Sequence, residues 1–254
     1  MGEPPKPTLI EIERAIARAW PADEVVDIGG WLWRGSGGGF GRANSVATLG
    51  GPPADIDAAI SEVERRYRAC RQPVLFQVTE ASLPADLGAR LLARGYDNSE
   101  TNATLLLDLA AAPPSPAVIP ADGVETATSA GAGWVDTYAT VLSAERRASA
   151  PRILARVPEP RQMIGVRRDG QHLATVLVVA DGPIAVVECV ATRPEARRMG
   201  IARVAMEAAI AEARALGATS VALGMAATNT AARALYTGLG FVEVGGNSYF
   251  RREL

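Results

Sequence analysis

The chain has 254 residues, of which 48% are hydrophobic and 21% are charged, as in an ordinary soluble globular protein. This length suits one or two domains whose cores need neither disulfides nor a metal for stability. The formal net charge of −2 argues against a protein built mainly to hold nucleic acid or an anionic membrane.

The first half of the chain alternates between helical and extended patterns. Apolar residues at helical spacing mark its helices, and β-branched or aromatic runs mark its strands. In chain order, we predict a helix over 10–19, strands over 25–34 and 42–49, a helix over 55–70, a strand over 73–79, a helix from Ser82 to Arg94, and a strand over 101–109. Trp31 and Trp33 share strand parity, so we expect both to face a core or the other half of the chain.

Residues 110–122 read AAAPPSPAVIPAD and separate the two halves of the chain. Proline removes backbone donors and fixes φ, so the segment is predicted to be an extended linker. The remaining parts, residues 1–109 and 123–254, are each long enough to be a domain.

The second half follows a similar plan. The predicted elements are a strand over 124–128, helices over 134–143 and 144–156, a hairpin of 162–168 with 172–180, a strand over 184–192, a helix over 201–216, a strand over 220–225, a helix over 229–239, and a strand pair from Phe241 onward. Val46-Ala-Thr recurs as Val190-Ala-Thr, and Gly95-Tyr recurs as Gly240-Phe. The nearly constant offset indicates an internal duplication.

The chain has two cysteines, Cys70 and Cys189, and one histidine, His172. We interpret the cysteines as small buried hydrophobic side chains in a reducing compartment, with a single disulfide as the alternative. A structural zinc site and a His-dependent catalytic triad are disfavoured, and no metal is expected. No signal-peptide pattern and no long apolar run is visible, so we expect a cytoplasmic protein with no membrane or nucleic-acid partner.

The segment Val190 to Ala202 carries the most informative pattern, in which an apolar strand ends, a basic loop follows and a helix begins. The first amides of a helix lack acceptors and lie at the positive end of its dipole, so this arrangement predicts an anion site that fits a pyrophosphate. Gly200 lets the backbone approach the phosphates, and Ala202 keeps the start of the helix narrow. Charge-assisted bonds are expected from Arg197, Arg198 and Arg203. The alternative is a solvated basic loop.

This loop resembles that of a known family. Arg197-x-x-Gly200-x-Ala202 matches the acyl-coenzyme-A loop of the GNAT superfamily of N-acyltransferases, and Asn229 to Phe241 matches the family's second signature, N-x-x-A-x-x-[LF]-Y-x-x-x-G-F. The clear resemblance covers about residues 123–254. It implies an α/β fold with a mixed, mostly antiparallel central sheet flanked by helices, in two tandem GNAT-like domains.

The resemblance also implies roles for individual residues. The backbone of Val190, Ala191 and Thr192 would pair with the pantetheine arm like an added strand. The pyrophosphate would be held by the amides of the loop, which belong to Arg198, Met199, Gly200, Ile201, Ala202 and Arg203. Asn229 would bond the pantetheine amides, or cap a helix, or do both.

Two side chains are candidates for proton transfer. By resemblance, Tyr236 would protonate the leaving thiolate; a buried core tyrosine is the alternative. Glu188 stands in an otherwise apolar strand, where a desolvated carboxylate has a raised pKa that suits a general base. The alternatives are a solvent-facing glutamate, or a water chain in place of a dedicated base.

The first half lacks both features. Leu49-Gly-Gly-Pro-Pro53 replaces the basic loop, and Leu91 stands where Tyr236 stands in the second half. Residues 1–109 therefore resemble a degenerate GNAT-like domain without the coenzyme A loop.

The resemblance implies transfer of an acetyl group from acetyl-CoA to an amine, by direct attack in a ternary complex and without a metal. The alternatives are transfer of a larger acyl group and a non-catalytic acyl-CoA-binding module. The resemblance also implies that the acceptor is contacted by the variable helices and loops of the fold, because binding residues are often found on such segments. In this chain these are residues 134–156 and the cleft between the halves. The sequence names neither the acceptor nor the oligomeric state.

Overall fold

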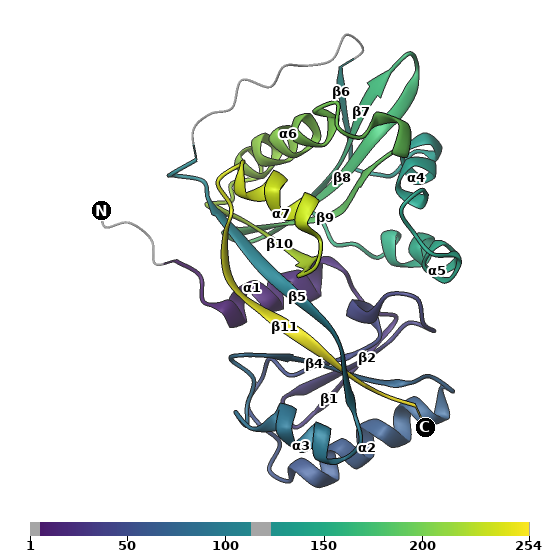
Figure 1. Cartoon of the computed structure of the whole chain (residues 1–254), viewed down its shortest axis with the longest axis vertical. Helices are drawn as coiled ribbons and strands as arrows, with labels where there is room; N and C mark the ends of the chain where they lie inside the picture. Colours follow the sequence, from purple (N-terminus) through teal and green to yellow (C-terminus); the bar gives the residue numbers. More distant parts are fainter. Residues whose placement is uncertain (1–5, 113–122, 254) are drawn as a thin grey trace.

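The computed structural model describes residues 6–112 and 123–253, which form a single sheet with helices on both faces (Figure 1). The predicted linker lies largely outside the described residues. The sheet has eleven strands in the order β1-β2-β3-β4-β11-β5-β10-β9-β8-β7-β6. Its described pairings are antiparallel except for β3 with β4 and β9 with β10, so the mixed, mostly antiparallel fold is confirmed.

The strands are β1 (Glu24–Ile28), β2 (Trp31–Gly35), β3 (Val46–Ala47), β4 (Val74–Thr79), β5 (Asp97–Asp108), β6 (Val124–Ala127), β7 (Arg161–Arg168), β8 (Gln171–Asp181), β9 (Ile184–Thr192), β10 (Ser220–Ala226) and β11 (Val242–Arg252). The helices are α1 (Leu9–Ala19), α2 (Ile56–Ala69), α3 (Leu87–Ala93), α4 (Ala132–Ala139), α5 (Ala144–Leu154), α6 (Ile201–Ala215) and α7 (Thr230–Thr237).

The two halves share the sheet by exchanging their last strands. Strand β5, from the first half, pairs with β10 of the second half, from Asp108 opposite Ser220 to Asn102 opposite Ala226. Strand β11, from the second half, lies between β4 and β5 and pairs with both. In Figure 1, β5 and β11 run side by side through the centre of the molecule. Separating the halves would expose the backbone groups of these strands, so the exchange ties the halves together.

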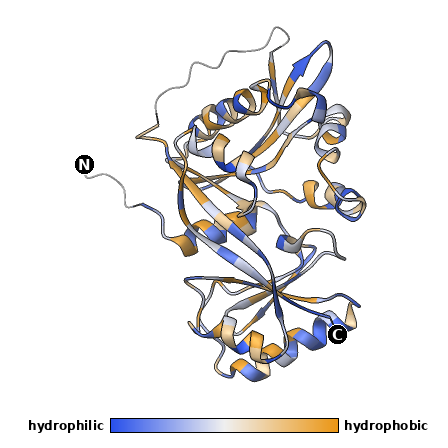
Figure 2. Cartoon of the chain, viewed as in Figure 1, coloured by the Kyte–Doolittle hydropathy of each residue, from blue (hydrophilic) through white to orange (hydrophobic). Residues whose placement is uncertain are grey.

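In the second half, the sheet has a different apolar layer on each face. Helix α6 covers one face, where Ala205, Met206 and Ala209 pack on strand residues such as Val176 and Val187. Helices α1 and α4 cover the other face, together with side chains such as Leu177, Val186 and Ala222. In Figure 2, α6 is mainly orange with interspersed blue residues, whereas the tip of the β7–β8 hairpin is blue. Helix α1 belongs to the first half of the sequence, but its apolar residues pack in the core of the second half.

The first half has its own core beneath α2. Trp31 and Trp33 are both buried there with Tyr67 and Phe76, so the prediction that they share a buried face is confirmed. Leu91 is also fully buried in this cluster. Helix α2 begins at Asp55, whose side chain accepts the amide of Ala58 at 3.0 Å.

Four predicted elements differ from the structure. The predicted strand 25–34 is a hairpin, because Gly29 and Gly30 turn the chain between β1 and β2. The predicted strand 42–49 is a 3₁₀ turn at Gly41–Ala43 followed by the two-residue β3. Ser82 caps no helix, because its hydroxyl accepts the amide of Thr79; α3 starts later. The predicted terminal strand pair is one long strand, β11.

The interpretation of the cysteines is half correct. Cys189 is buried, but Cys70 is exposed at the carboxyl end of α2, because its helix turns that position away from the core. Both are free thiols, so the alternative of a disulfide is wrong.

Candidate functional site

Strands β9 and β10 separate partway along their length. They pair in parallel only from Ile184 opposite Ser220 to Val186 opposite Ala222, although both strands continue beyond these pairs. A β-bulge lies in the divergent part of β9: two residues of β9, Cys189 and Val190, stand opposite a single residue of β8. Cys189 has a φ of +53°, and its carbonyl accepts the Thr175 hydroxyl at 3.0 Å. The β10-facing edge of Val190, Ala191 and Thr192 is therefore left without a strand partner.

The loop that follows β9 has a conformation that collects backbone donors. Gly200, the N-cap of α6, has a φ of +78°, and Arg198 has a φ of +63°. Across the described residues, the amides of Arg198, Met199, Gly200, Ile201 and Ala202 donate to no protein acceptor. The Gly200 carbonyl accepts the next two amides, those of Arg203 and Val204, at 3.0 and 3.2 Å. Consecutive unpaired donors at a helix start form a concave anion site.

The three arginines predicted to bind the anion have different surroundings. Arg197 is exposed and its Nε donates to the Thr192 carbonyl at 3.5 Å. Arg198 is exposed and has no side-chain partner within the described residues. Arg203 donates to the Gly238 carbonyl at 3.3 Å and pairs with Glu207 at 3.7 Å, so it ties α6 to the end of α7. Arg197 and Arg198 are thus the guanidinium groups most available to an anion.

Helix α7 and its N-cap supply the two candidate site residues of the second signature, Asn229 and Tyr236. Asn229 caps this helix, and its side-chain oxygen accepts the Ala232 amide at 3.1 Å. Tyr236 is 6% exposed and packs against Phe241 in the cluster below α6. Its hydroxyl has no partner among the described residues, which leaves it available to a ligand. Burial, and then the charge of Glu188, raise the pKa of Tyr236 to about 12, so the phenol stays protonated at neutral pH.

Glu188 lies on the opposite side of the divergence from α6. It shares strand parity with Val186, which packs on the α1 face of the sheet. Only 14% of its side chain is exposed, and Arg42, from the first half, donates to its carboxylate. Burial raises the pKa of Glu188, and the charge and hydrogen bond of Arg42 oppose this effect. The solvent-facing alternative for this residue is therefore wrong.

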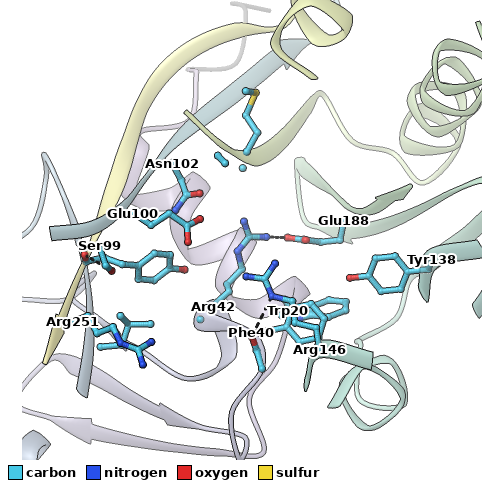
Figure 3. A pocket seen from close by; sticks show the side chains of 17 residues that line it. Trp20, Phe40, Arg42, Ser99, Glu100, Asn102, Tyr138, Arg146, Glu188 and Arg251 are labelled. Carbon is cyan, nitrogen blue, oxygen red and sulfur yellow. Dashed lines mark hydrogen bonds and ion pairs between the residues drawn. The ribbon is translucent and has the colours of Figure 1, made fainter. Parts of the chain in front are cut away.

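A cavity of about 380 Å³ opens next to Glu188, where the two halves meet (Figure 3). The principal side chains of its wall are Trp20, Phe40, Arg42, Tyr138, Glu188 and Tyr249. A volume of this size is typical of small-molecule sites. Arg146 also lines it, with its guanidinium over the Phe40 ring at 5.7 Å. Of the region 134–156, the structure brings Tyr138 and Arg146 to this cavity, whereas Arg152 and Arg156 pair with Asp23 instead.

Sequence reasoning did not find the contributions of the first half to this cavity. Phe40 and Arg42 follow the glycine-rich segment Gly35-Ser-Gly-Gly-Gly39, and the sequence pattern marked Arg42 only as the first residue of a predicted strand. An arginine next to a glycine-rich turn was the available signal, but no local rule connects it with a glutamate in β9.

The first half shows a different arrangement at the position of the divergence. The Thr48 hydroxyl donates to the Gln77 carbonyl at 2.9 Å and lies 2.6 Å from the Ser82 hydroxyl, so side chains link the end of β3 with β4. The carboxylate of Asp55 occupies the start of α2. An anion at this helix start would meet a negative charge.

No helix in residues 6–112 or 123–253 has the length and apolarity needed to cross a membrane. No group of three or more His, Cys, Asp or Glu side chains there is arranged to hold a metal ion.

Comparison with known proteins identifies the fold. Residues 132–241 match the model of the acetyltransferase (GNAT) family. A GCN5-related N-acetyltransferase from Kribbella flavida superposes with a TM-score of 0.73 at 18% identity, covering 97% of this chain and 96% of that one. A conserved protein of unknown function from Staphylococcus epidermidis superposes with a TM-score of 0.65 at 10% identity, covering 91% and 94%.

A third structure has the tandem arrangement. It is a tandem GNAT protein from the clavulanic acid biosynthesis pathway, with a TM-score of 0.60 at 18% identity, covering 78% of this chain and 69% of that one. No curated protein matches this chain in sequence. At these identities the structural matches establish the tandem fold.

Proposed function

Since residues 132–241 match the model of the acetyltransferase (GNAT) family, we propose that the protein transfers an acetyl group from acetyl-CoA to the amine of a small-molecule acceptor. One observation carries the proposal. The divergence of β9 and β10 has unpaired backbone donors on its α6 side and a glutamate in a cavity on its α1 side. A thioester held on one side can thus meet a nucleophile from the other.

The donor would lie along β9 and the start of α6. The free edge of Val190, Ala191 and Thr192 suits an extended amide-containing arm, as in strand addition. The unpaired amides of Arg198 to Ala202 suit the pyrophosphate, with Arg197 and Arg198 nearby. Residues 123–254 would therefore supply the whole donor site.

The acceptor would enter the cavity between the halves. In the proposed reaction, the amine nitrogen attacks the thioester carbonyl and forms the new C–N bond. The tetrahedral intermediate then breaks the C–S bond. Glu188 takes the proton that the amine loses, and Tyr236 gives a proton to the departing sulfur, so the protons balance. Two observations support these roles: the phenol of Tyr236 has a raised pKa of about 12 and so can donate a proton at neutral pH, and the Glu188 carboxylate is paired with Arg42.

Label transfer tests the proposal. The protein is incubated with acetyl-CoA labelled in the acetyl group and a panel of small amines, and acetylated products are identified by mass spectrometry. We expect label in an amide product, with one coenzyme A thiol released per product. Propionyl-CoA and longer thioesters in parallel reactions test the alternative of a larger acyl group. Tight donor binding without transfer to any amine would favour the non-catalytic alternative.

A further inference from the structure

Arg42 and Glu188 form an ion pair between the two halves of the chain. Arg42 belongs to the 3₁₀ turn Gly41–Ala43, and Glu188 belongs to β9. The two side chains are 20% and 14% exposed, and Nη1 of the arginine donates to Oε1 of the glutamate. Figure 3 shows them meeting across the cavity.

The guanidinium of Arg42 also contacts β10. A Cβ atom added at Gly224 would lie 2.7 Å from Nη2 of Arg42, closer than real Cβ contacts allow. The arginine therefore bridges β9 and β10 on the α1 side of their divergence, and glycine at position 224 leaves the space that it needs.

Arg42 is the one cation paired with Glu188 among the described residues. Other titratable groups surround this pair or line the same cavity: Glu13 on α1, Arg34 on β2, Glu100 on β5, Tyr138 on α4, Arg146 on α5, Cys189 on β9, Tyr236 on α7, and Tyr249 and Arg251 on β11. Burial keeps the pKa of the three tyrosines and the cysteine above their ordinary values, so these groups are neutral near pH 7. Burial is the largest single effect on Arg42 and lowers its pKa, but the combined attraction of Glu188, Tyr249, Glu13 and Tyr138 outweighs burial, so the pKa of Arg42 is raised.

We propose that Arg42 is a positioning residue for acetyl transfer: it holds the Glu188 carboxylate ionised and oriented at the divergence of β9 and β10. The half that lacks a donor loop would thereby supply a working part of the site. The inference rests on the proposed function, because it assumes that Glu188 accepts the amine proton.

The test is the pH profile of kcat/KM for acetyl transfer. A glutamate base works only when ionised, so activity falls as the pH falls through its pKa. Without Arg42, the effect that lowers the pKa of Glu188 is lost, and Arg42→Gln should move the acidic limb to higher pH by about 1–3 units. Arg42→Lys retains the charge, so its acidic limb should lie between those of the wild-type protein and Arg42→Gln. Arg18→Gln removes a guanidinium from an exposed pair with Asp181 and should leave the limb in place.

A second variant keeps the arginine. Gly224→Ala should push the guanidinium away from Glu188 without changing any charge, and should shift the acidic limb in the same direction by a smaller amount. If Arg42→Gln fails to fold, Gly224→Ala still tests whether Arg42 positions Glu188.

The outcomes separate the two claims. Acetyl transfer with an acidic limb unmoved by Arg42→Gln and Gly224→Ala would overturn the role of Arg42 and leave the proposed function standing. Full activity of Glu188→Gln with an unchanged profile would remove the base and the positioning role together. Absence of transfer by the wild-type protein would overturn the function itself.

Discussion

Asn247, on the last strand of the chain, donates its side-chain amide to the carboxylate of Glu13, on the first helix, at 3.3 and 3.4 Å. Gln77 on β4 donates to the same carboxylate at 3.0 Å, and the Thr104 hydroxyl on β5 also donates to it. Glu13 is 1% exposed. A single carboxylate thus joins α1 to three adjacent strands at the point where the halves exchange β5 and β11.

Replacing Glu13 should destabilise the whole protein. Glu13→Leu would leave three buried donors without their acceptor, and the loss should be about 3 kcal/mol of unfolding free energy. Urea unfolding measures it. Glu24→Leu, at an exposed position on β1, is the matched control and should change stability by less than about 0.5 kcal/mol. Equal effects of the two substitutions would show that the buried network adds nothing to stability.

Replacing Gly200 should abolish acetyl-CoA binding. In Gly200→Glu, the new side chain would enter the space of the pyrophosphate and add a repelling charge. Gly217→Glu is the control, because Gly217 lies at the other end of α6, also has a positive φ (+85° against +78°), and has the same open surroundings. The two variants should lose similar stability, and only Gly200→Glu should lose donor affinity in calorimetry. Unchanged affinity in the folded Gly200→Glu protein would mean that the phosphates bind elsewhere.

Coenzyme A should bind at one site per chain. In the first half, the carboxylate of Asp55 occupies the start of α2, and Thr48 links the ends of β3 and β4. Neither an anion site nor an open strand edge is left there. Calorimetric titration should therefore give a stoichiometry of one, and two equivalent sites would contradict the degenerate character of residues 1–109.

Tyr236→Phe should lower turnover without weakening donor binding. The ring and its packing on Phe241 remain, and only the hydroxyl is lost. Positioned acid catalysis is worth roughly 10²–10⁴-fold, so kcat should fall by about that factor while the dissociation constant of acetyl-CoA stays the same.

The pH profile adds a second readout for Tyr236. A pKa of about 12 means that the phenol stays protonated well above its ordinary range. The substitution should therefore reduce kcat equally at every pH up to about 10, and any alkaline limb below that pH should persist in the variant. Loss of such a limb in Tyr236→Phe would show that the phenol ionises earlier than its burial implies.

The sequence by itself determined the local parts of the proposed donor site. The loop Arg197 to Ala202, the cap Asn229 and the helix that bears Tyr236 depend on neighbours a few residues away, because helix starts, caps and tight turns use short-range contacts. The alternation of strands and helices in both halves could also be predicted, because it too depends on residues that are close in the sequence. Local signals were weaker at Gly29, where a hairpin stands in place of the predicted strand 25–34. They were also weaker at Ser82, where a turn stands in place of the predicted start of a helix.

Only the tertiary structure decided how the halves combine. Strand partners are set by contacts between distant segments, so no local pattern predicts that β11 lies between β4 and β5. Arg42 and Glu188 are 146 residues apart; the apolar strand around Glu188 drew attention to this residue, but only the sheet shows that Arg42 is its partner. Glu13 likewise fits a polar helix face in the sequence, but the exchanged strands bury it, since burial depends on what packs against a helix and not on the helix alone.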